Sequence, residues 1–208
     1  MFPKSTELPN KFIAKEKFYT HGDFIGKIKT SMTDDVAKIM AINQFSAKTL
    51  NIEAGKVFPE IMVLNVILKN RTFNAKILDA MDKSIRAAYI LFILQVDDQK
   101  SASIAFKDKN GDNISITKRW ITPWTDNLDL SIEGRSIDSV YEGLIKQISG
   151  GKLTSQADKT LKAKVLDAIE REKIIKKIEQ LENKMNNEPQ LKKKLEIKAI
   201  IRSLNEQL

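Results

Sequence analysis

"EIMVLNVILKN" (60–70) and "AAYILFILQV" (87–96) are the two apolar runs that decide the fold. Both are rich in β-branched residues and almost continuously apolar, which is typical of strands that are buried on both faces. Between them, "TFNAKILDAMDKSIR" (72–86) repeats apolar residues four apart and predicts an amphipathic helix capped by Thr72. A strand–helix–strand unit of this length forms a right-handed crossover, so the two strands are predicted to be parallel.

The segments upstream of this unit contribute less regular structure. Residues 1–30 alternate short polar and apolar clusters, and we expect an ordered segment that packs on the domain with few elements of its own. The next stretch, "SMTDDVAKIMAINQF" (31–45), has apolar residues at helical spacing after a cap at Thr33. Two aspartates in its first turn interact favourably with the positive N-terminal end of the helix dipole. It is therefore predicted to be a helix.

Downstream, the chain predicts further strands and one more helix. Asn110-Gly111 is a strong hairpin signal, and the strand after it runs through "NISITKRWITPW" (113–124). "NLDLSIEG" (127–134) predicts a last strand, and "SIDSVYEGLIKQISGG" (136–151) predicts a helix capped by Ser136. The expected fold class is α+β, with a mixed sheet of about five strands and packed helices in residues 1–151.

Residues 152–208 are predicted to form a separate arm, an antiparallel helical hairpin of coiled-coil type. Pro189 interrupts a long helical pattern, and the apolar residues on both sides of it step by four, three and four. The first helix is the longer one, so its early turns are expected to cover the α+β domain or another chain. The residues expected to bind a partner are Leu161, Val165, Ile174, Ile178, Leu181 and Met185.

Composition excludes several kinds of chemistry. The chain has no cysteine, which rules out disulfides, thiol catalysis and iron–sulfur clusters, and its one histidine, His21, lies in a predicted turn. We therefore expect no metal and no cofactor. Neither a signal peptide nor a membrane-spanning apolar run is evident, so the protein is expected to be cytoplasmic and without membrane contact.

The net charge of +8 permits contact with nucleic acid without requiring it. Residues 152–208 hold 14 basic and 9 acidic residues, so the excess is concentrated in the arm. Two interpretations of the 113–124 stretch stay open, core packing by its tryptophans or a surface on which bases stack. The residues that could contact nucleic acid are Lys118, Arg119, Trp124, Lys192, Lys193 and Lys194.

One pattern resembles a catalytic site. Asp97, Asp98 and Lys100 follow the second buried strand, in the acid-x-lysine order of magnesium-dependent nucleases, where carboxylates hold the metal and lysine steers the attacking water. Such a site needs another acid from a neighbouring strand. Aspartate and lysine are also common in hairpin turns, which is the alternative interpretation.

Several segments together resemble a bacterial family, domain of unknown function 4391. They are "PKSTELPNKFIAKEKFY" (3–19), "DDVAKIMAINQFSAKTLNI" (34–52), "ILDAMDKSIRAAYILFIL" (77–94) and "LDLSIEGRSIDSVYEGLIKQISG" (128–150), followed by the lysine-rich arm. Where the family commonly has a proline and an aromatic residue, this chain has Arg86-Ala87-Ala88. The resemblance implies an association with the helicases and DNA methyltransferases of restriction and phage-defence islands, and it implies no established activity.

Two hypotheses follow for the function. The first is a non-enzymatic accessory protein whose arm docks a helicase or methyltransferase, contacts DNA, or associates with a second copy of the chain. The second is a divergent magnesium-dependent nuclease that uses Asp97, Asp98 and Lys100. Lys4 to Glu7, which match the opening motif of the family, could form a surface site or tie the N-terminal segment to the domain.

Overall fold

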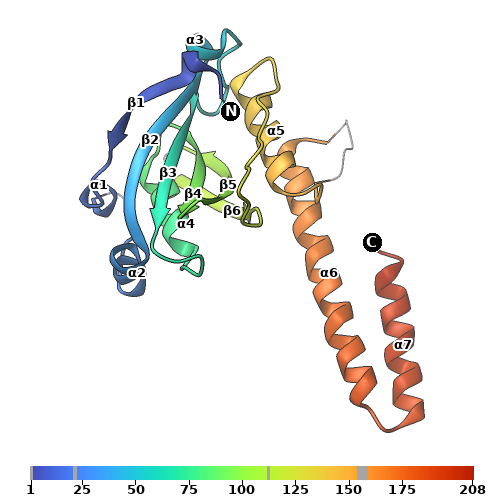
Figure 1. Ribbon diagram of the computed structural model, residues 1–208. Helices are drawn as coiled ribbons and strands as arrows, with labels where there is room; N and C mark the ends of the chain where they lie inside the picture. The colour runs from blue at the N-terminus through green and yellow to red at the C-terminus, as the bar shows by residue number, and fades with distance from the viewer. Residues whose placement is uncertain (1, 21–22, 112, 154–158) are drawn as a thin grey trace. The chain divides into compact units, whose positions relative to one another are not determined.

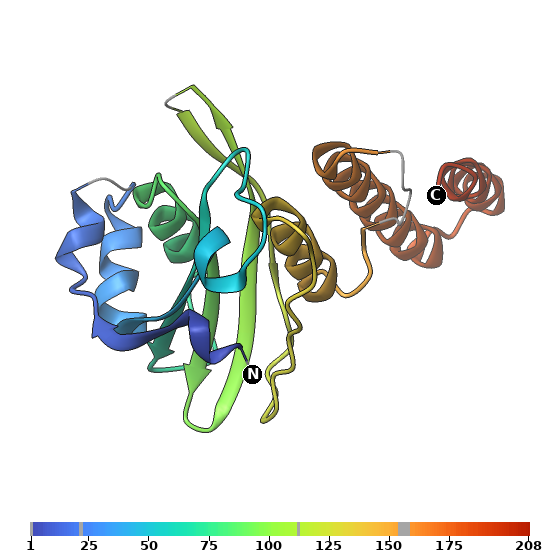
Figure 2. The same cartoon turned by 90° about the horizontal axis from the view of Figure 1, so that it is seen from above.

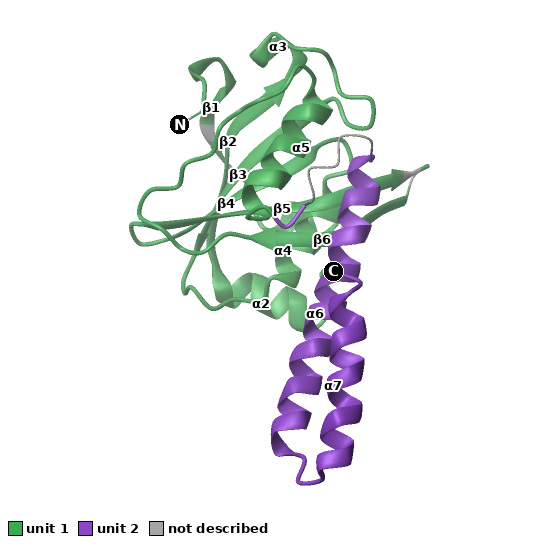
Figure 3. Cartoon of the chain, turned by 90° about the vertical axis from the view of Figure 1, so that its right-hand side faces the viewer, with its two compact units in different colours: residues 1–151 green, residues 152–208 purple. Residues whose placement is uncertain are grey.

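The computed structural model describes residues 2–20, 23–111, 113–153 and 159–208. The chain forms two compact units, residues 1–151 and 152–208, shown in green and purple in Figure 3. The predicted turn at His21 lies outside the described residues.

The first unit is built on a six-stranded mixed sheet whose strand order follows the chain (Figure 1). Its strands are β1 (Glu7–Phe12), β2 (Val36–Ser46), β3 (Glu60–Leu68), β4 (Tyr89–Val96), β5 (Gln99–Asn110) and β6 (Asn113–Ile121). Only β3 and β4 run parallel, and every other neighbouring pair is antiparallel. The predicted α+β fold and the parallel crossover are confirmed.

Helices cover both faces of this sheet (Figure 2). They are α1 (Glu16–Tyr19), α2 (Lys27–Asp35), α3 (Ala47–Leu50), α4 (Lys76–Ser84) and α5 (Ile137–Ile148), with a short 3-10 helix, η1 (Lys4–Thr6), before β1. In Figure 2 the blue α1 and α2 and the green α4 lie on one side of the sheet, and the gold α5 lies on the other. We call these sides the α4 face and the α5 face.

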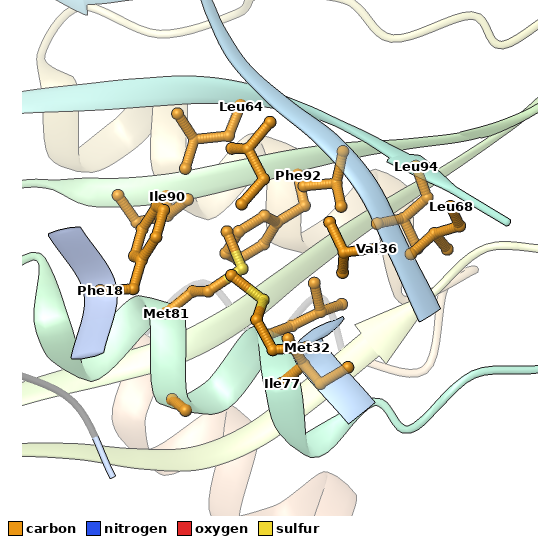
Figure 4. Close-up of a cluster of buried hydrophobic side chains, with 14 of the residues drawn as sticks. Phe18, Met32, Val36, Leu64, Leu68, Ile77, Met81, Ile90, Phe92 and Leu94 are labelled. Atoms are coloured by element: carbon orange, nitrogen blue, oxygen red, sulfur yellow. The ribbon is translucent and has the colours of Figure 1, made fainter. Parts of the chain in front are cut away.

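The α4 face holds the larger apolar cluster, shown in Figure 4. Met32 of α2 and Met81 of α4 lie against strand residues such as Leu64 and Phe92, all of them fully buried. Alternate residues of each strand point to this face, as the two-residue repeat of a strand requires. The apolar side of α4, at Ile77 and Met81, therefore meets β3 and β4 where the sequence pattern places it.

The expected helix over residues 31–45 is wrong beyond Asp35. Helix α2 ends at Asp35, and the chain continues as β2, which pairs with both β1 and β3. A β-bulge between Val36 and Lys38 places Val36 and Ile39, three residues apart, in the same cluster. Apolar residues three apart are also typical of a helix. Hydrogen bonding of β2 to β1 on one side and to β3 on the other stabilises the strand instead.

Three further expectations differ from the structure. The stretch 127–134 forms no strand, because isolated bridges tie down only the ends of this connection, at Thr125 and Ser136. Residues 1–30 contain η1, β1 and α1, so the N-terminal segment is more regular than expected. Helix α4 begins at Lys76 and not near Thr72, and the Lys76 amide donates to the side chain of Asn74 at 3.2 Å.

The second unit contains two helices, α6 (Leu161–Asn187) and α7 (Leu191–Asn205), joined by a short turn. Thr160 caps α6 by accepting a hydrogen bond from the Ala163 amide at 3.3 Å. The two helices pack through one apolar seam, which consists of Ile174, Ile178, Leu181 and Met185 of α6 and Ile197, Ile201 and Leu204 of α7. The predicted helical pair is confirmed. No helix in the described part of the chain has the length and apolar character needed to cross a bilayer.

Replacing Leu64 by alanine tests the importance of the α4-face cluster. Leu64 is fully buried, so we expect the free energy of unfolding to fall by about 2–5 kcal/mol in chemical denaturation. The matched control is Ile25→Ala, at a side chain that is 81% exposed, for which a change within about 0.5 kcal/mol is expected. Equal losses in the two variants would contradict this assignment of the core.

Candidate functional site

The most concentrated group of charges lies between α4 and the β5–β6 hairpin. Lys107 of β5 is 2% exposed, and its ammonium donates to the carbonyl oxygens of Asp82 at 2.9 Å, Ala88 at 2.7 Å and Ile85. The last carbonyls of a helix have no partner within the helix. Lys107 therefore closes the C-terminal end of α4 and fixes the turn that leads into β4.

Arg119 of β6 enters the same place from the neighbouring strand. Its Nε donates to Asp79 Oδ1 at 2.7 Å, and another guanidinium nitrogen pairs with Asp82 Oδ2. The guanidinium also donates to Ser103 Oγ at 3.1 Å and lies over the ring of Phe92. We call Asp79, Asp82, Lys107 and Arg119 the buried ion cluster.

Burial shifts the pKa values of two groups in this cluster, Asp82 and Lys107. Removal from water raises the pKa of Asp82, while Arg119 and Lys107 act in the opposite direction. Removal from water lowers the pKa of Lys107 to about 8, while the negative charge of Asp82 opposes the shift and Arg119 adds to it. Each charge therefore depends on its partners, as expected for buried ions.

Two tyrosines connect the cluster to α5 on the other face. Tyr141 of α5 donates to the Ala105 carbonyl and accepts from the Lys107 amide at 3.0 Å, and its ring stacks on Tyr89 at 3.6 Å. Tyr89 donates to Asp138 Oδ1 at 3.2 Å. Burial raises the pKa of both tyrosines. The hydroxyls, the ammonium and the guanidinium all have protein partners, so this arrangement serves to hold α4, β5 and α5 together.

A second place of interest is a cavity of about 310 Å³ on the α5 face, which we call the sheet-face cavity. It lies away from the buried ion cluster and contains one predicted site residue, Lys100. Its lining residues are Phe2, Glu7, Ile42, Asn43, Ile93, Lys100, Asp126, Asn127, Leu128 and Leu130.

The predicted nuclease residues lie at the turn between β4 and β5. Asp97 and Asp98 form this turn and are exposed, and Asp97 adopts the left-handed conformation with φ of 52°. The backbone of Lys100 pairs with Thr125 through hydrogen bonds of 2.8 and 2.9 Å. Within the described residues, no three acidic or histidine side chains gather where they could hold a metal ion. The nuclease hypothesis stays a prediction.

The predicted nucleic-acid contacts occupy different environments. Arg119 belongs to the buried ion cluster and would have to leave two carboxylates to reach a phosphate. Trp124 is partly buried against the α4-face cluster, and Lys118 of β6 is half-buried. Lys192 and Lys193 are exposed on α7, and Lys194 is half-buried. Contact of any of these residues with nucleic acid stays a prediction.

The predicted partner-binding residues divide into two groups. Ile174, Ile178, Leu181 and Met185 pack against α7 in the seam of the hairpin. Leu161, at the start of α6, is half-buried, and Val165 is fully buried. Sequence reasoning missed the outer face of α7, where Leu191 and Leu195 are 72% and 59% exposed.

Sequence reasoning also missed the buried ion cluster. Two signals were present: Asp79 and Asp82 stand three apart within an amphipathic helix, and Lys107 ends the apolar run of β5. Neither signal identifies its partner, because β5 and β6 meet α4 only through the tertiary fold.

Comparison with known proteins gives one match. The model of a family described as "Domain of unknown function (DUF4391)" matches residues 1–208, the whole chain. No curated protein and no solved structure matches.

Replacing Lys107 by methionine tests the role of its ammonium. Three carbonyl oxygens lose their donor and Asp82 loses a counter-charge, so we expect the free energy of unfolding to fall by about 3–5 kcal/mol at pH 7. Lys11→Met, at an exposed lysine of β1, is the control and should change stability by less than about 0.5 kcal/mol.

The pH dependence of stability gives a second measurement. The folded pKa of Lys107, about 8, lies below the ordinary value of 10.5, so the unfolded chain binds more protons between these values. The contribution of this site to stability therefore increases as pH rises from 8 towards 10.5. Denaturation between pH 7.5 and 9.5 should show this increase in the wild type and not in Lys107→Met. An equal increase in both proteins would refute the assignment.

Proposed function

We propose, for a chain that belongs to the DUF4391 family, that it binds another protein through its α6–α7 hairpin as a non-enzymatic accessory subunit. The partner is a helicase or DNA methyltransferase of a restriction or phage-defence system, which is the context that the family resemblance implies. We infer the location of the docking surface from the exposed side chains of α7.

The observation that carries this proposal is the apolar and basic stripe on the outer side of α7. Leu191, Leu195, Lys198 and Arg202 follow each other at steps of four, three and four, so they share one face of the helix. All four are exposed. Single exposed leucines are common, whereas two on one helical turn beside cations form a docking patch of the kind used in helix recognition.

The inner side of α7 has a different role. Ile197, Ile201 and Leu204 are buried against α6, and four of the six α6 residues first expected to bind a partner meet them in that seam. Those α6 side chains are already occupied within the hairpin. The outer side of α7 is therefore the better surface for a second protein.

The charges of α7 indicate what kind of partner surface this stripe would fit. Helix α7 contains four lysines and one arginine against a single glutamate, Glu196. The complementary surface has an apolar depression for Leu191 and Leu195 surrounded by carboxylates. In such an interface the buried apolar anchors contribute most of the affinity, while the charges raise the association rate.

The double variant Leu191→Asp/Leu195→Asp tests the apolar anchors. After co-expression of the full chain with a helicase and a DNA methyltransferase of a restriction or phage-defence system, we expect the wild type to co-purify with one of them. The double variant should bind at least about 30-fold more weakly, the effect of losing a hot-spot residue. Both sites are exposed, so its thermal unfolding should match that of the wild type.

Ile25→Asp is the matched control, because Ile25 is an exposed apolar residue of the first unit. It should leave co-purification unchanged. Equal capture of wild type and double variant would refute docking through α7, and so would a loss of capture in Ile25→Asp.

The double variant Lys192→Glu/Lys193→Glu tests the charges. We expect slower association with the purified partner at low salt and a weaker dependence on ionic strength, measured by surface plasmon resonance. The control Lys11→Glu/Lys17→Glu carries the same change in net charge on exposed lysines of the first unit and should not alter the association rate.

Two other results would count against a helicase or methyltransferase partner. Binding of duplex DNA that falls steeply with salt and is lost in Lys192→Glu/Lys193→Glu would assign α7 to nucleic acid. A concentration-dependent dimer in sedimentation velocity that is lost in Leu191→Asp/Leu195→Asp would assign the stripe to a second copy of the chain.

A further inference from the structure

Helix α7 carries two sets of residues with the same heptad spacing. One set, Ile197, Ile201 and Leu204, forms the seam with α6. The other set is the exposed stripe on the far side, which we call the outer stripe and which consists of Leu191, Leu195, Lys198 and Arg202. Lys198 directly follows Ile197 and Arg202 directly follows Ile201, so the outer stripe is turned by about 100° from the seam. Steps of four and three are those of a helix that packs on another helix, so α7 offers a second packing face beside the one that α6 occupies.

The surface along this second face is hollowed by a shallow groove. Leu195, Lys198 and Arg202 of the outer stripe line the groove together with Ala199 and Ile201. The side chain of Ala199 is a single methyl group and that of Ile201 is turned into the seam, so neither fills the space between the longer side chains. When two helices pack, a side chain of one inserts into a hole between side chains of the other. The groove supplies holes of this kind.

The charges of the outer stripe disfavour pairing with a second copy of itself. In a parallel pair, Lys198 and Arg202 would each face the same cation of the other chain, which is repulsive. In an antiparallel pair, the two cations would face Leu195 and Leu191 of the other chain and would lose water without gaining a counter-charge. The outer stripe therefore fits a helix of different sequence.

The order of residues in the outer stripe indicates what that helix carries. Leu191 and Leu195 need apolar side chains opposite them, whereas Lys198 and Arg202 need carboxylates. In the described chain, Lys198 makes no ion pair, and Arg202 meets Glu206 of the next turn at 3.5 Å. An exposed pair of this kind contributes little to stability, so a carboxylate of the partner can join or replace it.

Helix dipoles favour an antiparallel orientation of the partner helix. The cations of the outer stripe lie in the C-terminal half of α7, so an antiparallel partner places its acidic residues in its own N-terminal half. Carboxylates are stabilised near the positive N-terminal end of a helix and destabilised near the negative C-terminal end. A parallel partner would place the same acidic residues in its C-terminal half, where its own dipole opposes them.

We propose that the element that binds α7 is an amphipathic α-helix of the partner protein, packed antiparallel on the outer stripe. Its contact face carries two acidic residues followed by two apolar residues, at steps of four, three and four. The acidic residues meet Arg202 and Lys198, and the apolar residues meet Leu195 and Leu191. The helix occupies the docking surface of the proposed function, on which its assignment rests.

Two synthetic peptides of about 20 residues, enough to span α7, test this order without the partner protein. The matched peptide carries Glu, Glu, Leu and Leu at the four contact positions in a background of alanine and glutamine. The reversed peptide has the same composition and carries Leu, Leu, Glu and Glu. Each is titrated into the ¹⁵N-labelled full chain, and binding is followed by the NMR shifts of the amides of residues 191–205. We expect saturable binding of the matched peptide, at least about tenfold tighter than that of the reversed peptide.

Charge reversal connects the acidic residues to their partners on α7. The variant Lys198→Glu/Arg202→Glu should bind the matched peptide at least about 30-fold more weakly than the wild type does. It should bind a third peptide, in which both Glu are replaced by Lys, about as tightly as the wild type binds the matched peptide. This rescue shows that α7 remains folded in the variant. The control Lys173→Glu/Lys177→Glu, at two exposed lysines four residues apart on α6, should bind the matched peptide as the wild type does.

The outcomes distinguish a helical partner element from docking through α7 as such. If Leu191→Asp/Leu195→Asp abolishes co-purification and the matched peptide does not bind, docking through α7 stands and the helical element is overturned. The helical element is overturned as well if the reversed peptide binds as tightly as the matched one, or if charge reversal leaves binding of the matched peptide intact. If the matched peptide binds as expected and neither the helicase nor the methyltransferase co-purifies, the proposed partner is overturned and the preference of α7 for this helix stands.

Discussion

The contact on which the first unit depends is the one between the ammonium of Lys107 and the end of α4. The β3–α4–β4 crossover must return the chain to the sheet at Tyr89, and the carbonyls released at the end of α4 lie where water is excluded. A single lysine of β5 binds the carbonyls of Asp82 and Ile85 at this end and the carbonyl of Ala88, which directly precedes β4. A distant strand therefore stabilises the turn that makes β3 and β4 parallel.

Asp82 and Arg119 complete the charge pairing around the buried ammonium of Lys107. A buried ammonium beside a helix end needs a counter-charge, and Asp82 provides it from the last turns of α4. Asp82 in turn needs the guanidinium of Arg119 from β6. Buried ions of this kind contribute little net stability when paired and cost much when separated.

The sequence predicted those parts of the fold that repeat with a regular period. The crossover, the Asn110-Gly111 hairpin, the Ser136 cap and the helical pair follow from apolar spacing and turn chemistry, which act locally. Strand β2 could not be predicted because a bulge gives its apolar residues a helical spacing. The buried ion cluster and the sheet-face cavity depend on residues from four or more elements, and no local pattern indicates which of them meet.

The second shift of register in β2, between Ala41 and Asn43, has a consequence for the whole unit. Before it, Ile39 and Ala41 belong to the α4-face cluster; after it, Asn43 and Phe45 face the opposite layer. One inserted residue thus moves the buried side chains of β2 from the α4 face, at Ile39 and Ala41, to the opposite face, at Asn43 and Phe45. Deleting that residue would exchange the inside and outside of half the strand, so chain length here is under as strong a constraint as residue identity.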